Sequence, residues 1–278
     1  MTTSICYVNG TFTRLDEAAL PVQDLAILRG YGVFDFLRTY HGRPFRLLAH
    51  LERLENSARL IGLALPESLP TIATIVEETL RRNELSEANI RIVVTGGIAQ
   101  DGITPAAQAS LIVLVTPAKI YPLDFYSKGV KIITVETERY LPGAKTINYI
   151  PAMLALQEAK KKKAVEALYV NQAGHILEGT TTNFYIFQGD TLLTPKDGIL
   201  FGVTRDIVLE LGRNHNFSLE ERALTFADLE QADEVFITAS NKEMMPVSQV
   251  NEIVIGTGRP GANTQQLMAS FRELVWAK

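Results

Sequence analysis

Apolar and polar residues alternate with a period of two over several short segments, a pattern typical of half-buried β-strands. Residues 4–12 predict two short strands around an Asn9-Gly10 turn, because Asn-Gly suits the left-handed backbone of a tight hairpin. The other predicted strands lie at 34–40, 90–95, 109–116, 130–136, 166–171, 183–188, 191–194 and 233–239.

Apolar residues spaced three to four apart predict helices between these strands. The predicted helices span 47–60, 71–83, 150–164, 204–214 and 265–276. Short strands interleaved with helices indicate an α+β protein built from two α/β domains. We place a smaller N-terminal domain at 1–117, a linker at 118–123 and a larger C-terminal domain at 124–278.

The composition narrows the class of protein further. Hydrophobic residues make up 46% of the 278 residues, so a full core can be built. A formal charge of −4 gives no electrostatic case for binding nucleic acid or an anionic membrane. The single cysteine, Cys6, excludes an internal disulfide, and together with the absence of a long apolar run it predicts a cytoplasmic protein.

One lysine lies between a predicted strand and a predicted helix, in the stretch Leu141-Pro142-Gly143-Ala144-Lys145-Thr146-Ile147-Asn148-Tyr149. A lysine amine can form a Schiff base with a carbonyl when its pKa is lowered. Most lysines before helices are simply solvated. The segment alone therefore leaves a catalytic lysine and a surface lysine both open.

Two segments could bind an anion. Gly202 leads into a predicted helix whose first free amides, at Val203 and Thr204, suit a phosphate. Thr204 could equally be an ordinary helix cap. Arg53, on the predicted helix 47–60, could bind a phosphate through two parallel bonds, although arginines on helix surfaces are far commoner.

Two polar segments beside predicted strands complete the candidate chemistry. Glu178, in an expected turn between two strands, could accept a hydrogen bond from a protonated ring nitrogen. Thr238-Ala239-Ser240-Asn241 follows an apolar strand, where small polar residues suit the close approach of an anion. A plain polar turn explains either segment as well.

Taken together, the order and spacing of these segments resemble the fold-type IV pyridoxal-phosphate (PLP) enzymes. That family includes D-amino-acid transaminases, branched-chain transaminases and aminodeoxychorismate lyases. The resemblance runs from Tyr7-Val8-Asn9-Gly10 to Gly258-Arg259-Pro260-Gly261-Ala262-Asn263-Thr264, and is strongest at Lys145 with Asn148, at Leu177-Glu178-Gly179-Thr180-Thr181-Thr182-Asn183 and at Gly202-Val203-Thr204-Arg205. It implies this family's fold, PLP as cofactor, no metal, and a homodimer whose active sites borrow residues from the partner subunit.

The resemblance also implies residue roles. Lys145 would hold the cofactor covalently and move the proton at the substrate Cα, and Glu178 would pair with the pyridine nitrogen. The remaining cofactor contacts are implied at Arg53, the amides of Val203 and Thr204, Ser240 and Tyr149. The substrate contacts are implied at Phe34, Thr182, Thr238 and Ala239.

The groups that bind the substrate carboxylate depart from the pattern of the D-amino-acid transaminases, which use a Tyr, an Arg and a His. Phe34 stands at the Tyr position, Gly96 stands at the Arg position, and no His is apparent in 97–102. An unpaired carboxylate in a closed site is costly. Arg29 and Arg91 are the candidate replacements, and an ion pair elsewhere is the alternative for each.

The resemblance implies a ping-pong transamination between a D-amino acid, of the D-alanine or D-glutamate type, and a 2-oxo acid such as 2-oxoglutarate or pyruvate. Asn148 lies three residues after Lys145, as in the D-amino-acid transaminases and the lyases, whereas branched-chain transaminases have one residue more. An L-branched-chain transaminase, an aminodeoxychorismate lyase and a PLP-free binding protein remain the alternatives.

Overall fold

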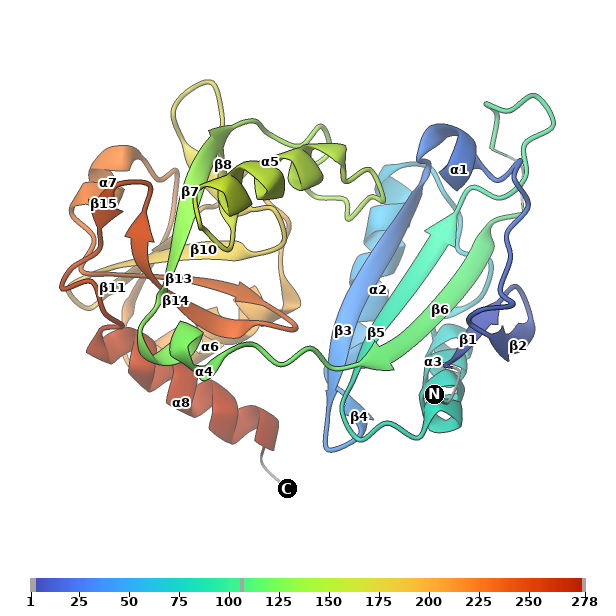
Figure 1. The fold of residues 1–278 in the computed structure, drawn as a ribbon, viewed down its shortest axis with the longest axis horizontal. Helices are drawn as coiled ribbons and strands as arrows, with labels where there is room; N and C mark the ends of the chain where they lie inside the picture. Colours follow the sequence, from blue (N-terminus) through green and yellow to red (C-terminus); the bar gives the residue numbers. More distant parts are fainter. Residues whose placement is uncertain (1–3, 106–107, 277–278) are drawn as a thin grey trace. The chain divides into compact units, whose positions relative to one another are not determined.

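The computed structural model describes residues 4–105 and 108–276, which form two compact units (Figure 1). Unit 1 consists of the chain up to Lys119 together with the short segment Ala144–Asn148. Unit 2 consists of Ile120–Gly143 and the chain from Tyr149 onwards. The boundary near residue 119 lies inside the predicted linker, but the segment around Lys145 belongs to unit 1 and lies far beyond that linker in the sequence.

Unit 1 is built on an antiparallel sheet of six strands, in the order β2-β1-β6-β5-β3-β4. The strands are β1 (Ile5–Val8), β2 (Thr11–Arg14), β3 (Gly32–Tyr40), β4 (Arg43–Pro44), β5 (Ala88–Thr95) and β6 (Ser110–Pro117). Its helices are α1 (Leu25–Arg29), α2 (Leu47–Leu60) and α3 (Leu69–Asn83). The predicted hairpin is present, with Asn9 and Gly10 both at positive φ.

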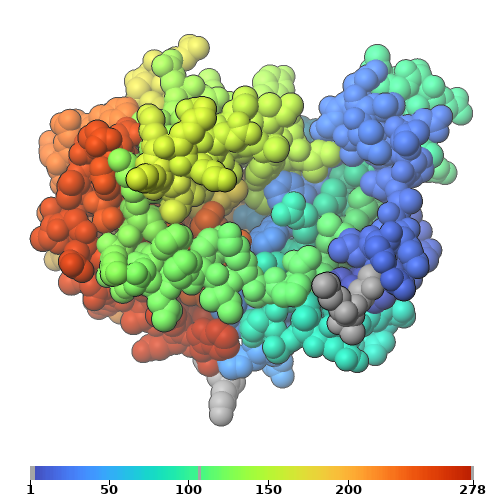
Figure 2. Space-filling view, viewed as in Figure 1, coloured from blue at the N-terminus to red at the C-terminus, as the bar shows by residue number. Residues whose placement is uncertain are grey.

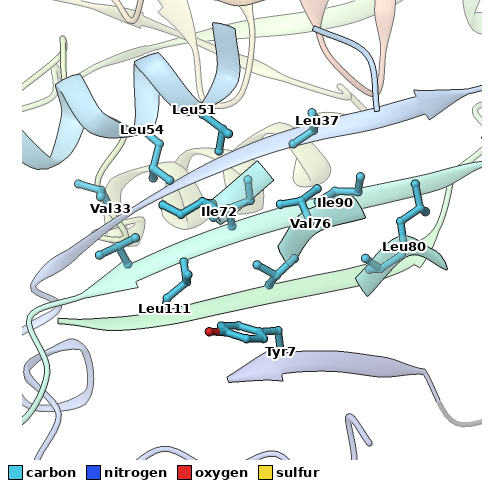
Figure 3. Packing of buried hydrophobic residues seen from close by; sticks show 14 of the residues in the cluster. Tyr7, Val33, Leu37, Leu51, Leu54, Ile72, Val76, Leu80, Ile90 and Leu111 are labelled. Carbon is cyan, nitrogen blue, oxygen red and sulfur yellow. The ribbon is translucent and has the colours of Figure 1, made fainter. Parts of the chain in front are cut away.

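The core of unit 1 lies between the sheet and the helices α2 and α3 (Figure 3). Leu51 and Leu54 follow helical spacing on α2, and Ile72 and Val76 do so on α3, so each helix buries one apolar stripe. On β3 the residues that point towards this core are every second one. Val33 and Leu37 therefore enter the core, while Phe34 and Phe36 point to the other face.

The segment Ala144–Asn148 pairs with the edge of β3 through backbone hydrogen bonds. The Phe34 N–H donates to the Lys145 carbonyl at 2.9 Å, the Ile147 N–H donates to the Gly32 carbonyl at 3.1 Å, and Val33 faces Thr146 in an antiparallel bridge. Gly32 leaves room on both sides of β3, since a Cβ there would lie 3.1 Å from Ile147 Cδ1 of this segment and 2.7 Å from the Val94 carbonyl oxygen of β5. Lys145 is thus anchored by backbone bonds to β3.

Unit 2 contains a mixed sheet of nine strands, in the order β12-β11-β10-β13-β14-β7-β8-β9 with β15 added to β14. The strands are β7 (Val130–Glu136), β8 (Ala167–Val170), β9 (Ile176–Gly179), β10 (Asn183–Gln188), β11 (Thr191–Thr194), β12 (Ser218–Glu221), β13 (Glu234–Ala239), β14 (Glu243–Val250) and β15 (Ile253–Val254). The helices are α4 (Leu123–Ser127), α5 (Ile150–Lys161), α6 (Val203–Asn214), α7 (Phe226–Glu230) and α8 (Ala262–Trp276).

The short elements α4, α7, β12 and β15 of unit 2 were not predicted from the sequence. Three further differences concern longer or functionally important segments. Glu178 lies on the strand β9 and not in a turn; the strand has only four residues and only Ile176 and Leu177 are apolar, too few to show a period in the sequence. The helix α5 ends at Lys161, and Lys163 adopts a left-handed backbone with φ 58°, which stops the predicted helix short of residue 164. The strand β14 was not predicted because Pro246 interrupts the pattern, yet Pro246 sits in register with Phe236.

The α+β fold class is confirmed. In the part of the chain that the structure describes, no helix combines the length and the apolar character needed to cross a bilayer.

Candidate active site

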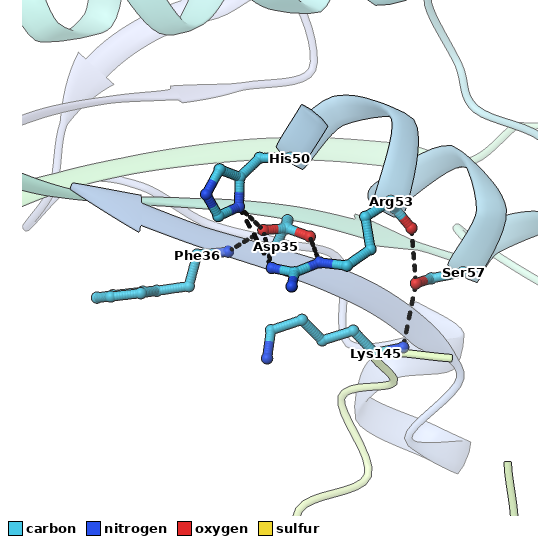
Figure 4. Close-up of polar contacts among 6 residues, drawn as sticks. All are labelled: Asp35, Phe36, His50, Arg53, Ser57 and Lys145. Carbon is cyan, nitrogen blue, oxygen red and sulfur yellow. Dashed lines mark hydrogen bonds and ion pairs between the residues drawn. The ribbon is translucent and has the colours of Figure 1, made fainter. Parts of the chain in front are cut away.

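Lys145 is fixed through its backbone and presents its side chain over an aromatic ring. The Lys145 N–H donates to Ser57 Oγ at 3.1 Å, and that hydroxyl donates to the Arg53 carbonyl at 2.8 Å, so the lysine is tied to α2 as well as to β3 (Figure 4). Its Nζ lies 4.7 Å from the centre of the Phe34 ring. The predicted lysine and the predicted aromatic residue are therefore brought together in unit 1.

Arg53 belongs to a buried cluster with Asp35 and His50 (Figure 4). Its Nε and Nη2 each donate to a different oxygen of Asp35 at 2.8 Å, which is the paired geometry that arginine forms with carboxylates. His50 Nδ1 lies 2.6 Å from Asp35 Oδ1. The side chain of Asp35 is 0% exposed and that of Arg53 is 12% exposed, so the guanidinium has a fixed orientation.

The charges of this cluster determine its protonation. Burial opposes ionisation of Asp35, but Arg53 and His50 outweigh it and hold the pKa of that carboxyl below its ordinary value. Burial lowers the pKa of His50, and the positive charges of Arg53 and Lys145 lower it further against the opposing effect of Asp35. The cluster therefore contains an ionised aspartate and an arginine cation. The positive charge of Lys145 also acts on His50 within it.

In unit 2, Glu178 is a buried carboxylate whose two oxygens both accept hydrogen bonds. Arg139 Nε donates to Oε1 at 2.9 Å and Arg139 Nη2 lies 2.6 Å from the same oxygen. The Leu200 N–H donates to Oε2 at 3.0 Å. An arginine and a backbone amide thus fix the orientation of the acidic group that the sequence singled out.

The N-terminus of α6 lies beside the ends of β10 and β13. Gly202 is the cap of the helix, so Thr204 is its second residue and is not the cap. A Cβ on Gly202 would collide with Asn183 Oδ1, and Asn183 is in register with Thr238. The free amides of a 12-residue helix, at Val203 and Thr204, are thereby placed next to the strand end that carries Thr238.

The other predicted contact residues of unit 2 lie in or beside turns and at the start of α5. Thr238 is buried, and its hydroxyl lies 3.2 Å from the Tyr185 hydroxyl. Ala239 and Ser240 are half-buried, and Thr182 is buried in the turn between β9 and β10. Tyr149 caps α5 in unit 2.

Arg91 and Arg29 occupy different surroundings in unit 1. The Arg91 guanidinium lies 5.4 Å from the centre of the Phe34 ring and 5.6 Å from that of Phe36, on the sheet face that Lys145 Nζ also contacts. Arg29 ends α1 and donates to the carbonyl of its own neighbour Leu28. No ion pair of either arginine occurs within the described residues.

Gly96 stands where the resemblance puts an arginine, and the structure gives the reason. A Cβ at position 96 would lie 2.5 Å from Cδ1 of Tyr31, whose ring fills that space. A large side chain cannot enter there unless Tyr31 moves.

Sequence reasoning missed the partners of the predicted residues: Asp35, His50, Arg139, Glu166 and Lys242. Only Asp35 left a signal, because it is a charged residue at an inward position between Val33 and Leu37. Among residues 4–105 and 108–276, no three side chains of the metal-binding types gather into a site.

Comparison with known proteins identifies relatives over nearly the whole chain. The family model "Amino-transferase class IV" matches residues 32–250. A putative branched-chain-amino-acid aminotransferase of Methanocaldococcus jannaschii is 34% identical over 96% of this chain and 95% of its own. The D-alanine aminotransferase of Staphylococcus aureus is 29% identical over 97% of each chain.

Among solved structures, the branched-chain amino acid aminotransferase of Escherichia coli is similar with a TM-score of 0.93. The two are 27% identical in sequence, over 99% of this chain and 95% of that one. A second branched-chain amino acid aminotransferase, from T.th. and solved with pyridoxamine 5'-phosphate, has a TM-score of 0.92 at 27% identity over the same shares of the two chains.

Substituting Asp35→Asn tests the buried cluster. The change keeps the shape but removes the charge that compensates Arg53, so we expect the free energy of unfolding to fall by about 3 kcal/mol, as when one partner of a buried pair is lost. Urea denaturation measures this. The control Asp16→Asn breaks the exposed pair with Arg14 and should change little. An Asp35→Asn protein as stable as wild type would contradict the cluster's role.

Proposed function

Because the chain belongs to the class IV aminotransferases, which are PLP-dependent, we propose that it transfers an amino group between a D-amino acid and a 2-oxo acid by a ping-pong mechanism. The amino acid is of the D-alanine or D-glutamate type, and the acceptor is 2-oxoglutarate or pyruvate. The observation that carries the proposal is the half-buried Lys145 amine, held over Phe34 next to the Arg53 cluster.

The donor groups within each unit match the chemistry of one part of PLP. The cofactor has a carbonyl, a ring nitrogen and a phosphate, and the chain offers an amine, a fixed carboxylate and amides at a helix N-terminus for them. Gly202 is the cap of α6, so the amides of Val203 and Thr204 in the first turn are the donors available to a phosphate. When bound, PLP supplies the electron sink for cleaving a bond at the substrate Cα.

Each predicted residue then has a role. Lys145 would hold the cofactor covalently and carry the proton to and from the substrate Cα. Glu178, oriented by Arg139, would accept a hydrogen bond from the protonated ring nitrogen. The phosphate is bound by Arg53, the amides of Val203 and Thr204, and Ser240. Tyr149 contacts the phenolic oxygen of the ring.

The substrate carboxylate is bound by Arg91, with Arg29 as the second candidate. Arg91 is supported by its position over Phe34 and Phe36 on the face of Lys145, and by the absence of an ion pair within the described residues. A cation there compensates a carboxylate that would be costly to leave unpaired. The remainder of the proposed substrate site is lined by Phe34, Thr182, Thr238 and Ala239.

Transfer between L-branched-chain amino acids and 2-oxo acids is the second candidate. It is favoured by the Methanocaldococcus jannaschii relative and by the aromatic face of Phe34 and Phe36, which suits an apolar side chain. The D-amino-acid interpretation is supported by the three-residue spacing from Lys145 to Asn148 and by the D-alanine aminotransferase relatives. Elimination of pyruvate from aminodeoxychorismate is a further alternative on the same lysine.

We also propose that the enzyme is a cytoplasmic homodimer. Ile150, Met153 and Leu154 of α5 are 67%, 59% and 57% exposed, and this helix, yellow-green in Figure 2, lies at the surface. Such apolar exposure favours burial against a second copy. The buried thiol of Cys6, the one cysteine in the sequence, suits a reducing compartment. Light scattering of the holoenzyme reports the mass directly.

Lys145→Ala should abolish turnover. Removing the amine removes both the covalent link and the proton carrier, so we expect a loss of several orders of magnitude, together with loss of the absorbance band of the covalently bound cofactor. Lys160→Ala, on the exposed surface of α5, is the control and should retain both. Unchanged activity of Lys145→Ala would end the proposal.

Arg91→Ala should raise the KM for amino acids by about 10- to 100-fold, the effect of losing a hydrogen bond to a charged group. Arg29→Ala tests the second candidate in the same steady-state assay. Arg59→Ala, on the exposed end of α2, serves as the control. If neither Arg91→Ala nor Arg29→Ala changes the KM, the carboxylate is bound elsewhere.

A chiral substrate panel separates the candidate functions. With 2-oxoglutarate as acceptor, we expect turnover of D-alanine or D-glutamate to exceed that of L-leucine and L-valine. Turnover of the L-amino acids alone would replace the first candidate with the second. Pyruvate released from aminodeoxychorismate without any amino acceptor would identify a lyase.

A further inference from the structure

A buried carboxylate stands immediately before β8 and has no part in the proposed chemistry. Glu166 is 0% exposed. Its Oε1 accepts from the Ala167 N–H at 3.0 Å, from the Thr180 N–H at 3.2 Å and from the Thr180 hydroxyl. Its Oε2 accepts from the Thr181 hydroxyl at 2.9 Å. One carboxylate thus organises the turn 180–182 between β9 and β10.

Lys242 provides the counter-charge from a different turn. It ends the connection between β13 and β14, is 9% exposed, and places Nζ 2.5 Å from Thr181 Oγ1 and 3.4 Å from Glu166 Oε2. The Thr181 hydroxyl therefore accepts from the ammonium and donates to the carboxylate. The Tyr126 hydroxyl donates to the Lys242 carbonyl at 3.1 Å, so this end of the turn is fixed through its backbone too.

Both turns adjoin proposed cofactor contacts. Gly179, directly after Glu178, lies so close to the first turn that a Cβ on it would collide with Thr182 Oγ1 and lie 3.1 Å from Glu166 Cγ. Ser240 lies two residues before Lys242 in the second turn. A displacement of either turn would therefore be transmitted to Glu178 or to Ser240.

A buried ion pair is a weak source of stability, because the cost of taking two charges out of water offsets much of their attraction. Such a pair does fix the orientation of its two side chains, because their charged atoms must meet. The relay from Lys242 through Thr181 to Glu166 joins two turns that are 61 residues apart in the sequence.

We propose that Lys242 is a positioning residue for the cofactor: through Thr181 and Glu166 its ammonium holds the turn 180–182, beside Glu178, against the turn that carries Ser240. This inference rests on the cofactor roles proposed for Glu178 and Ser240. Loss of the ammonium releases the two turns from each other, so the two cofactor contacts no longer keep their spacing. PLP affinity then falls more than turnover at saturating PLP.

The test is Lys242→Met in the full-length protein, with Lys128→Met as the matched control, since Lys128 forms an exposed pair with Asp124 in the same unit. PLP is titrated into the cofactor-depleted proteins, and the dissociation constant is obtained from absorbance. We expect at least a tenfold weaker PLP affinity for Lys242→Met, no change for Lys128→Met, and kcat at saturating PLP within about twofold of wild type. Thr181→Val, which removes only the bridging hydroxyl, should weaken PLP binding in the same direction and remains informative if Lys242→Met does not fold.

The double variant Lys242→Met/Glu166→Gln separates positioning from stability. Removing both charges should restore the thermal midpoint of the cofactor-depleted protein without restoring PLP affinity, because the tie between the turns is still absent. Wild-type PLP affinity in Lys242→Met and Thr181→Val, or recovery of affinity in the double variant, would overturn the inference. Either result leaves the proposed function intact, because Lys145→Ala tests that separately.

Discussion

The structure depends on five residues joining the sheet of unit 1 from far along the sequence. Ala144–Asn148 forms backbone hydrogen bonds with the edge of β3, although the chain on both sides of it belongs to unit 2. Backbone bonds fix a lysine more firmly than a solvated loop would, because they remove its main-chain freedom before any ligand arrives. The position of the Lys145 amine over Phe34 follows from this strand-like addition.

Three buried acidic groups among the described residues are each paired with a cation. Asp35 orients Arg53, Arg139 orients Glu178, and Lys242 compensates Glu166. Buried charges are tolerated when they are paired and hydrogen-bonded, and the pairing sets their direction at the same time. The proposed contacts Arg53 and Glu178 are therefore held in a fixed orientation by their charged partners before any cofactor binds.

The sequence was sufficient for the parts that rest on local pattern. The hairpin at Asn9-Gly10, the helix 47–60 and the helix beginning near Gly202 follow from turn chemistry and spacing, which act over a few residues. The charge pairs could not be predicted because their partners are distant in the chain. Lys242 and Glu166, for example, are 76 residues apart, and the sequence does not give the strand order that brings them together. The strand β9 was not predicted because its two apolar residues, followed by Glu178 and Gly179, are too short a run to show a period.

The proposed enzyme needs the amine of Lys145 to carry the cofactor. Borohydride reduction of the holoenzyme, followed by digestion and tandem mass spectrometry, locates that amine directly because reduction makes the link permanent. We expect a pyridoxyl group on the peptide that contains Lys145 and on no other lysine, including the buried Lys242. A label on a different lysine, or no label on Lys145, would contradict this expectation.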